Sequence, residues 1–244
     1  MIKLKKKILI TVLCSLIFSC NKREKINFED LMIVKGSIKG LRKGKLYLQR
    51  FKDTMLINVD SAYVDGSPEF RFQTPIKTAE VFYLYLNKDD GDSLNDRILF
   101  FGEKGTIEIN TLLKTFESSA KISGSKNQEL LQKYKSMSRK FNNKNLDLIR
   151  DLYIAKAEKK IERVDTLEKK IANLLNRRYL YTINFAAQNP DQNIAPYLGI
   201  TQVFDANLTL LDSIASKLTD EVRSSKYGIE FLNLLEKRRE KERN

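Results

Sequence analysis

The spacing of apolar residues changes near Gly124, and this change limits the fold more than any other feature of the sequence. Before it, short runs rich in β-branched and aromatic residues are divided by turn residues. After it, glycine is scarce and apolar residues recur at steps of three and four. The sequence therefore predicts an α+β chain, with an antiparallel β-sandwich or open barrel over residues 31–125 and an α-helical segment with one long helix over residues 126–244.

Turn residues divide the first part into eight β-rich runs. The runs span residues 31–40, 45–51, 56–65, 69–74, 80–87, 97–101, 105–110 and 120–125. Such close spacing favours antiparallel hairpins. The run Val81–Leu86 is apolar on both faces, which is typical of a central strand that is covered on both sides. We expect the helical segment to supply the second cover.

The second part predicts several helices. A first helix is indicated by Leu130, Leu131, Tyr134 and Met137, and it is expected to end near Asn142–Asn145. A long helix then follows, with its apolar seam at Leu146, Ile149, Tyr153, Ala157, Ile161, Val164, Leu167, Ile171, Leu174 and Arg178. Later helices are expected at 195–204, 208–218 and 229–241. The narrow seam fits packing within the chain or a coiled-coil dimer, and its short length favours the former.

The first twenty residues read as an export signal. Lysines precede an apolar run that is too short to span a bilayer, and Ile17, Phe18 and Ser19 lead to Cys20 in the manner of a bacterial lipobox. We expect a signal peptide at 1–19, a lipidated Cys20 and a tether over 20–30. Acyl chains on Cys20 would hold the chain in the cell envelope, and Asn21 after the cysteine favours the outer membrane, on either its periplasmic or its outer face.

The residue types that the expected mature chain lacks exclude several kinds of catalysis and metal binding. Cys14 leaves with the signal and Cys20 is the anchor, so the mature chain has no cysteine pair. The sequence also contains no histidine, which rules out Ser-His-Asp and Cys-His catalysis and His-ligated metals. We therefore expect a non-enzyme with no cofactor and no metal site.

Positive charge is concentrated in one segment. The formal net charge is +13, and between residues 126 and 178 lysine and arginine outnumber aspartate and glutamate by 15 to 7. An exported lipoprotein rarely meets nucleic acid, so none is expected as a partner. Anionic lipid head groups, an acidic partner or an ordinary solvated helix face are the interpretations that fit.

Two clusters are candidate sites. The polar stretch Asn87–Asp96 lacks the residue order of an EF-hand loop and reads as a hairpin tip. Aromatic residues on neighbouring predicted strands can line a ligand groove or fill a core, and the core is the more frequent use. These residues are Phe82, Tyr83, Tyr85, Phe100 and Phe101.

A known family resembles the first part of the chain. The features that match are the Gly36–Gly44 hairpin, the Asp60-Ser61 and Asp65-Gly66 turns and the strand that ends Phe70-Arg71-Phe72. They are similar to a domain of unknown function at the N-terminus of many exported bacterial lipoproteins, in which a helical segment and a thioredoxin-like domain of the thiol-disulfide interchange class follow. This chain ends near where that domain would begin, so the resemblance implies an accessory half without its redox cysteines.

These expectations lead to three functions for an envelope lipoprotein. The first is a non-catalytic binding or accessory module, anchored to the membrane, that holds a protein partner or ligand. The second is a self-associating structural lipoprotein that forms a homodimer through the helical segment. The third is the non-catalytic half of a split thiol-disulfide interchange system.

Overall fold

A computed structural model describes residues 30–87 and 96–243. The signal, the lipobox, Cys20 and most of the tether lie outside the described residues, as do residues 88–95 of the polar stretch. The eight predicted β-rich runs all form strands. They are β1 (Leu31–Lys39), β2 (Lys43–Lys52), β3 (Met55–Asp65), β4 (Glu69–Pro75), β5 (Glu80–Asn87), β6 (Arg97–Gly102), β7 (Gly105–Leu112) and β8 (Lys121–Ser123).

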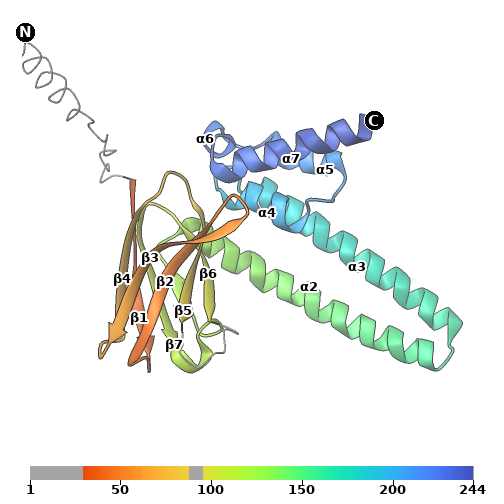
Figure 1. The fold of residues 1–244 in the computed structure, drawn as a ribbon. Helices are drawn as coiled ribbons and strands as arrows, with labels where there is room; N and C mark the ends of the chain where they lie inside the picture. The colour runs from red at the N-terminus through yellow and green to blue at the C-terminus, as the bar shows by residue number, and fades with distance from the viewer. Residues whose placement is uncertain (1–29, 88–95, 244) are drawn as a thin grey trace, which may run out of the picture.

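The strands form two four-stranded sheets that pack face to face (Figure 1). Sheet A has the order β4-β1-β7-β8 and sheet B has the order β3-β2-β5-β6. Their facing sides share one apolar core, in which Phe72, Phe82 and Phe100 are among the largest fully buried side chains. The α+β fold is confirmed, and the two sheets form a sandwich that does not close into a barrel.

One strand pair differs from the all-antiparallel expectation. β1 and β7 run parallel, with Gly36 opposite Ile109, while every other pair described is antiparallel. Hairpin spacing predicts pairing between neighbours in the chain, but β1 and β7 are joined through the whole of β2–β6. A side chain at Gly36 would lie 1.7 Å from the Ile109 carbonyl oxygen, so this close pairing requires glycine.

The helical segment follows directly. Its helices are α2 (Lys126–Ala157), α3 (Ile161–Ala187), α4 (Ile194–Gln202), α5 (Leu208–Ala215), α6 (Asp220–Arg223) and α7 (Lys226–Arg243), and a short 3-10 helix η2 (Leu113–Thr115) precedes β8. α2 and α3 form an antiparallel hairpin that projects beyond both the sandwich and the group α4–α7 (Figure 1).

The expected break near Asn142–Asn145 and the expected long helix over 146–178 are both wrong. α2 runs without interruption through the asparagines, and the chain reverses instead after Glu158. Lys159 makes the turn, with φ at 55°. The Lys159 N–H donates to the Lys156 carbonyl, and the Lys160 N–H donates to the Ala155 carbonyl. This is a Schellman turn, whose left-handed position is usually glycine, so the sequence signal for a helix end is missing here.

The reversal divides the predicted seam between two helices. Val164, Leu167, Ile171 and Leu174 on α3 pack within the chain, as expected, but against Leu148, Leu152 and Ala155 of α2. The α2 half of the seam points elsewhere: Leu146 is 63% exposed, Ile149 46% and Tyr153 77%. Because these three residues lie at i, i+3 and i+7, they form one apolar stripe along the outside of α2.

Helices cover one part of the outer face of sheet B. Val81 and Phe101 face Leu131, Tyr134 and Leu198 in a second apolar core, so the first half of β5 is buried on both faces as predicted, whereas Tyr85 in its second half lies outside this core. Two buried side-chain oxygens also accept hydrogen bonds from backbone N–H groups across this junction. Gln128 Oε1 accepts the Phe101 N–H at 2.8 Å, and Tyr227 Oη accepts the Val81 N–H at 3.0 Å. These bonds satisfy polar groups that would otherwise be unpaired in a dry interface.

The N-terminal turn of α2 also fixes the start of α4. Asn127 Oδ1 accepts the Ile194 N–H at 2.9 Å, while Asn127 Nδ2 donates to Glu103 at 2.8 Å. One side chain therefore joins the two helices to the end of β6. In the described part of the chain, no helix has the length and apolarity that a membrane crossing needs.

Candidate functional site

The predicted aromatic set does not gather in one groove. Phe82 and Phe100 are stacked inside the sandwich core at 5.9 Å, and Phe101 is fully buried against the helices. Tyr83 is half-buried at the edge of that helical contact, where it meets Phe51. Only Tyr85 stands on a part of sheet B that the helices leave uncovered. Three of the five residues are therefore core residues, in agreement with the interpretation that the sequence favoured.

The polar stretch contributes little to the described structure. Asn87 ends β5, Asp96 is buried just before β6, and the residues between them lie outside the described part. Across residues 30–87 and 96–243, no group of three or more His, Cys, Asp or Glu side chains is placed to hold a metal ion.

A buried ion-pair cluster lies at the junction of sandwich and helices. Glu80 is almost fully buried, and its two oxygens accept from Arg50 Nη1 at 2.6 Å and from Lys226 Nζ at 2.5 Å. Lys226 also donates to the Phe51 carbonyl at 2.9 Å. The cluster thus connects β2 and β5 with the first residue of α7, and each charge has its partner. We assign it a structural role, as a clamp between the two parts.

Two tyrosines beside this clamp are held in the neutral form. Burial raises the pKa of Tyr197 to about 12. Burial also raises the pKa of Tyr227, although its hydrogen bond with Val81 opposes the shift. Their rings contact each other and Phe101, with centroids 5.2 Å apart between the two tyrosines. Neither phenol is placed for proton transfer near neutral pH.

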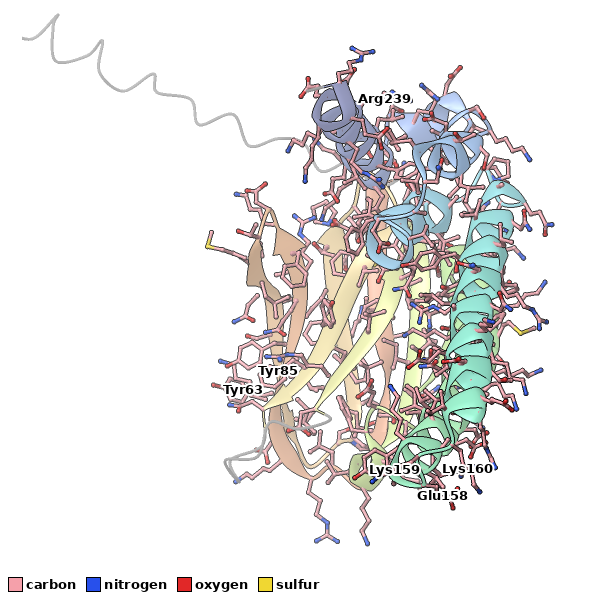
Figure 2. The ribbon with its side chains drawn as sticks, turned by 90° about the vertical axis from the view of Figure 1, so that its right-hand side faces the viewer. Tyr63, Tyr85, Glu158, Lys159, Lys160 and Arg239 are labelled. Atoms are coloured by element: carbon pink, nitrogen blue, oxygen red, sulfur yellow. The ribbon has the colours of Figure 1, made fainter. Side chains whose placement is uncertain are left out.

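Rings and cations alternate across the uncovered part of sheet B. We call this surface the tyrosine face, and it consists of Tyr63 on β3, Lys45 and Tyr47 on β2, Tyr85 on β5 and Arg97 on β6. Strand register brings them together, since Lys45 pairs with Tyr63, Tyr47 with Tyr85, and Tyr85 with Arg97. Figure 2 shows Tyr63 and Tyr85 on the sandwich, clear of the α4–α7 group.

Short contacts order the tyrosine face into one stack. Lys45 Nζ lies 4.9 Å from the ring centroids of both Tyr47 and Tyr63. Tyr47 and Tyr85 are stacked at 5.9 Å with an interplanar angle of 23°. Arg97 covers the other side of Tyr85, with Cζ 4.7 Å from its centroid. Each cation thus contacts the electron-rich face of a ring, an arrangement that stabilises the charge and restricts the side chains.

A second row of polar groups holds Arg97 in place. Its Nε donates to Gln49 Oε1 at 3.4 Å, and Gln49 Nε2 donates to Asn58 Oδ1 at 2.8 Å. The guanidinium is therefore held at one edge through its Nε, and a guanidinium has four further N–H donors.

A recess of about 610 Å³ opens beside the stack. Lys45, Tyr47 and Tyr63 of the tyrosine face line it, together with Lys43, Asp65 and Asn87. Hydrogen bonding with Tyr47 and Tyr63 raises the pKa of Lys45, so its charge is retained at any physiological pH. The recess has the size of a small-molecule site, and its lining combines tyrosine rings with charged and polar groups.

A different surface lies on the helical hairpin. Phe141, Ile149, Ile171 and Leu175 line a groove of about 190 Å³ between α2 and α3, together with Asn142, Asn145, Leu174 and Arg178. The groove adjoins the exposed stripe of α2. Glu158, Lys159 and Lys160 mark the far end of the hairpin in Figure 2.

Sequence reasoning named only one member of the tyrosine face, Tyr85. Lys45 and Tyr47 lie in the predicted run 45–51, but their neighbours depend on the strand order β3-β2-β5-β6. The alternation of lysine and tyrosine within β2 was the one available signal. The clamp partner Lys226 lies 146 residues from Glu80 and has no local signature.

The fold and the site together define an α+β protein with an exposed aromatic and cationic sheet face. Residues 32–131 match the family model described as "Domain of unknown function (DUF4369)", which covers the sandwich and the start of α2. The comparison with curated proteins gave no match. A solved structure described as "pT26-6p" is similar at 12% identity with a TM-score of 0.23, over 80% of this chain and 42% of that chain, and a similarity of this size supports no conclusion about fold or function.

Proposed function

We propose that this chain is a cell-envelope lipoprotein, anchored through Cys20 in the outer membrane, that acts as a non-catalytic binding module. The tyrosine face is its binding surface. One observation carries the proposal: the helices cover one part of sheet B and leave a preordered row of three tyrosines and two cations uncovered. Exposed tyrosine and arginine side chains on a rigid element are the groups that contribute most to recognition.

Three properties of the tyrosine face support binding rather than catalysis. Its cations are positioned by ring faces and, for Arg97, by Gln49, and Lys45 stays protonated, so it cannot act as a base toward the neighbouring tyrosines. The strands beneath it are fixed by the sandwich core, so its geometry does not have to form on contact. A preordered surface binds with a smaller entropic cost than a mobile one.

Binding to isolated envelopes tests the proposal. The probe is the chain of residues 20–244 with Cys20→Ser, which removes the anchor and keeps every described residue. We expect saturable binding, weakened about tenfold by Tyr63→Ala with Tyr85→Ala. Phe204→Ala is the control, because Phe204 is an aromatic residue, 54% exposed, that follows α4 and lies outside both the tyrosine face and the α2 stripe. Equal binding of the double variant and the wild type would refute the proposal.

The anchor requires a separate test. Substitution Cys20→Ser in the full-length chain, followed by cell fractionation, should release the protein from the membrane fraction, because no acyl chains can then be added. Unchanged membrane retention would contradict the lipoprotein assignment without bearing on the tyrosine face.

Self-association is the second candidate, and the exposed stripe of α2 is the observation that favours it. The ion pairs Arg150–Asp147 and Lys156–Glu168 reduce the positive charge beside the stripe, so two copies could approach. In sedimentation velocity, Ile149→Asp should then weaken a dimer, whereas Leu180→Asp, at an exposed leucine on α3, should not. A monomer at all concentrations excludes this function. The split thiol-disulfide system stays a prediction from the family resemblance.

A further inference from the structure

The chemistry of the tyrosine face limits the class of ligand that it can bind. This inference rests on the proposed function. Lys45 Nζ lies 4.9 Å from the ring centroids of both Tyr47 and Tyr63, so the ammonium stands beside two phenols. Lysine can only donate hydrogen bonds, so it takes up neither phenol proton, and both hydroxyls can donate to an incoming group.

The donors point to an anionic ligand. Two hydroxyls, the Lys45 ammonium and the Arg97 guanidinium lie along one stack, and Lys43 lines the adjoining recess. Anions accept hydrogen bonds from such groups more strongly than neutral acceptors do. The stack spans all four strands of sheet B, so it can contact several units of an extended ligand rather than one isolated ion.

The recess adds a requirement that a simple polyanion does not meet. Asp65 and Asn87 line the same recess as the lysines. A carboxylate needs a donor from its ligand, and it repels a chain that carries only negative groups. The ligand should thus have O–H donors as well as anionic groups, together with apolar faces that pack on the tyrosine rings.

We infer that the tyrosine face binds an acidic polysaccharide, a chain of sugar units that carry carboxylates. Its carboxylates accept from Lys45, Arg97 and the tyrosine hydroxyls, and its hydroxyls donate to Asp65 and accept from Asn87. The C–H faces of the sugar rings pack on the exposed side of Tyr63. Neighbouring strands lie about 5 Å apart, which is close to the length of one sugar unit, so successive units can meet successive side chains.

Four defined probes test this ligand class by calorimetry, with the chain of residues 20–244 carrying Cys20→Ser. Oligogalacturonate supplies both carboxylates and hydroxyls, a maltooligosaccharide of equal length supplies hydroxyls alone, and polyglutamate and a single-stranded oligonucleotide supply charge on other backbones. We expect oligogalacturonate to bind at least about tenfold more tightly than each of the other three.

Variants locate the binding. Tyr63→Ala and Lys45→Gln should each weaken oligogalacturonate binding about tenfold, whereas the controls Phe204→Ala and Lys160→Gln should leave it unchanged. Asp65→Asn should strengthen polyglutamate binding more than oligogalacturonate binding, because the change removes a carboxylate that repels both polyanions but can accept hydrogen bonds from the sugar hydroxyls alone. Circular dichroism of each variant confirms that it is folded.

The outcomes separate this inference from the proposed function. Equal binding of polyglutamate or the oligonucleotide would show attraction by charge alone and overturn the ligand class. Failure of oligogalacturonate to bind, while Tyr63 and Tyr85 still control binding to envelopes, would also overturn the class and leave the binding module in place. Loss of tyrosine dependence in both experiments would remove the proposed function as well.

Discussion

Single residues at the junction determine how the helical part is held to the sandwich. Glu80 contacts two cations from different elements, and neither cation has another carboxylate among the ion pairs described for the clamp. Burial makes this contact more valuable than a surface ion pair, because removal of one partner leaves charge in a poorly solvated place.

Glu80→Gln should lower the free energy of unfolding by about 2 to 3 kcal/mol, since Arg50 and Lys226 would lose their counter-charge while remaining partly solvated. The control is Glu129→Gln, which breaks the exposed Lys126–Glu129 pair and should cost less than about 0.5 kcal/mol. Urea denaturation measures both. Similar losses in the two variants would show that the clamp is unimportant for stability.

Because Tyr197 is buried in the neutral form, the free energy of unfolding should fall at high pH. The pKa of Tyr197 is near 10 when unfolded and about 12 when folded, so the unfolded chain loses this proton first. Its contribution is fully present below pH 10 and is lost as the pH rises from 10 to 12, with a slope of about 1.4 kcal/mol per pH unit. Denaturation at pH 9, 10 and 11 should give a flatter decline for Tyr197→Phe, while Tyr153→Phe on the hairpin keeps the wild-type slope. A steeper or equal decline in Tyr197→Phe would contradict this account.

At the scale of elements, the strands were predictable and their partners were not. Each strand has a pattern in its own residues that predicts it. In Glu69–Pro75, for example, polar and apolar residues largely alternate, and every second side chain is buried. Strand order depends on contacts between distant segments, as in the parallel pairing of β1 with β7. The tyrosine face belongs to this second class, because it exists only when β3, β2, β5 and β6 are adjacent.

The helix reversal was missed for a different physical reason. A helix-ending turn with one residue in the left-handed backbone conformation usually has glycine or asparagine there, but here Lys159 occupies that position. The apolar periodicity runs on across the turn, since both helices bury residues near it. Without a breaker residue, one long helix and a hairpin give the same pattern.

Lys159→Gly should stabilise the α2–α3 hairpin by about 0.5 to 1 kcal/mol. Glycine adopts φ 55° without the steric cost that lysine carries, and this gain exceeds the added entropy of the unfolded chain. Lys160→Gly is the control: its φ of −85° suits any residue, so the change should destabilise the hairpin instead. Hydrogen exchange of the α3 amides reports both. Shifts of the same sign would refute the assigned strain.

On the scale of the whole molecule, burial is uneven along the helices. The proximal ends of α2 and α3 share the second apolar core with sheet B, through Leu131, Tyr134 and Phe185. The distal half of the hairpin depends on a small cluster in which Leu148, Ala155 and Leu167 are the buried members. Local opening costs least where few apolar contacts are lost. The hairpin should therefore open from its tip while the junction stays closed.

Native-state hydrogen exchange can reveal this gradient. Amides of residues 146–175 should exchange with an opening free energy at least about 2 kcal/mol below that of β5, β6 and residues 128–134. Leu167→Ala should lower the opening free energy further for the hairpin amides alone, because Leu167 belongs to the distal cluster. Leu198→Ala, at the shared core, should lower protection in both the sandwich and the helices. Uniform protection along α2 and α3 would instead mean that the projecting hairpin unfolds together with the sandwich, as one cooperative unit.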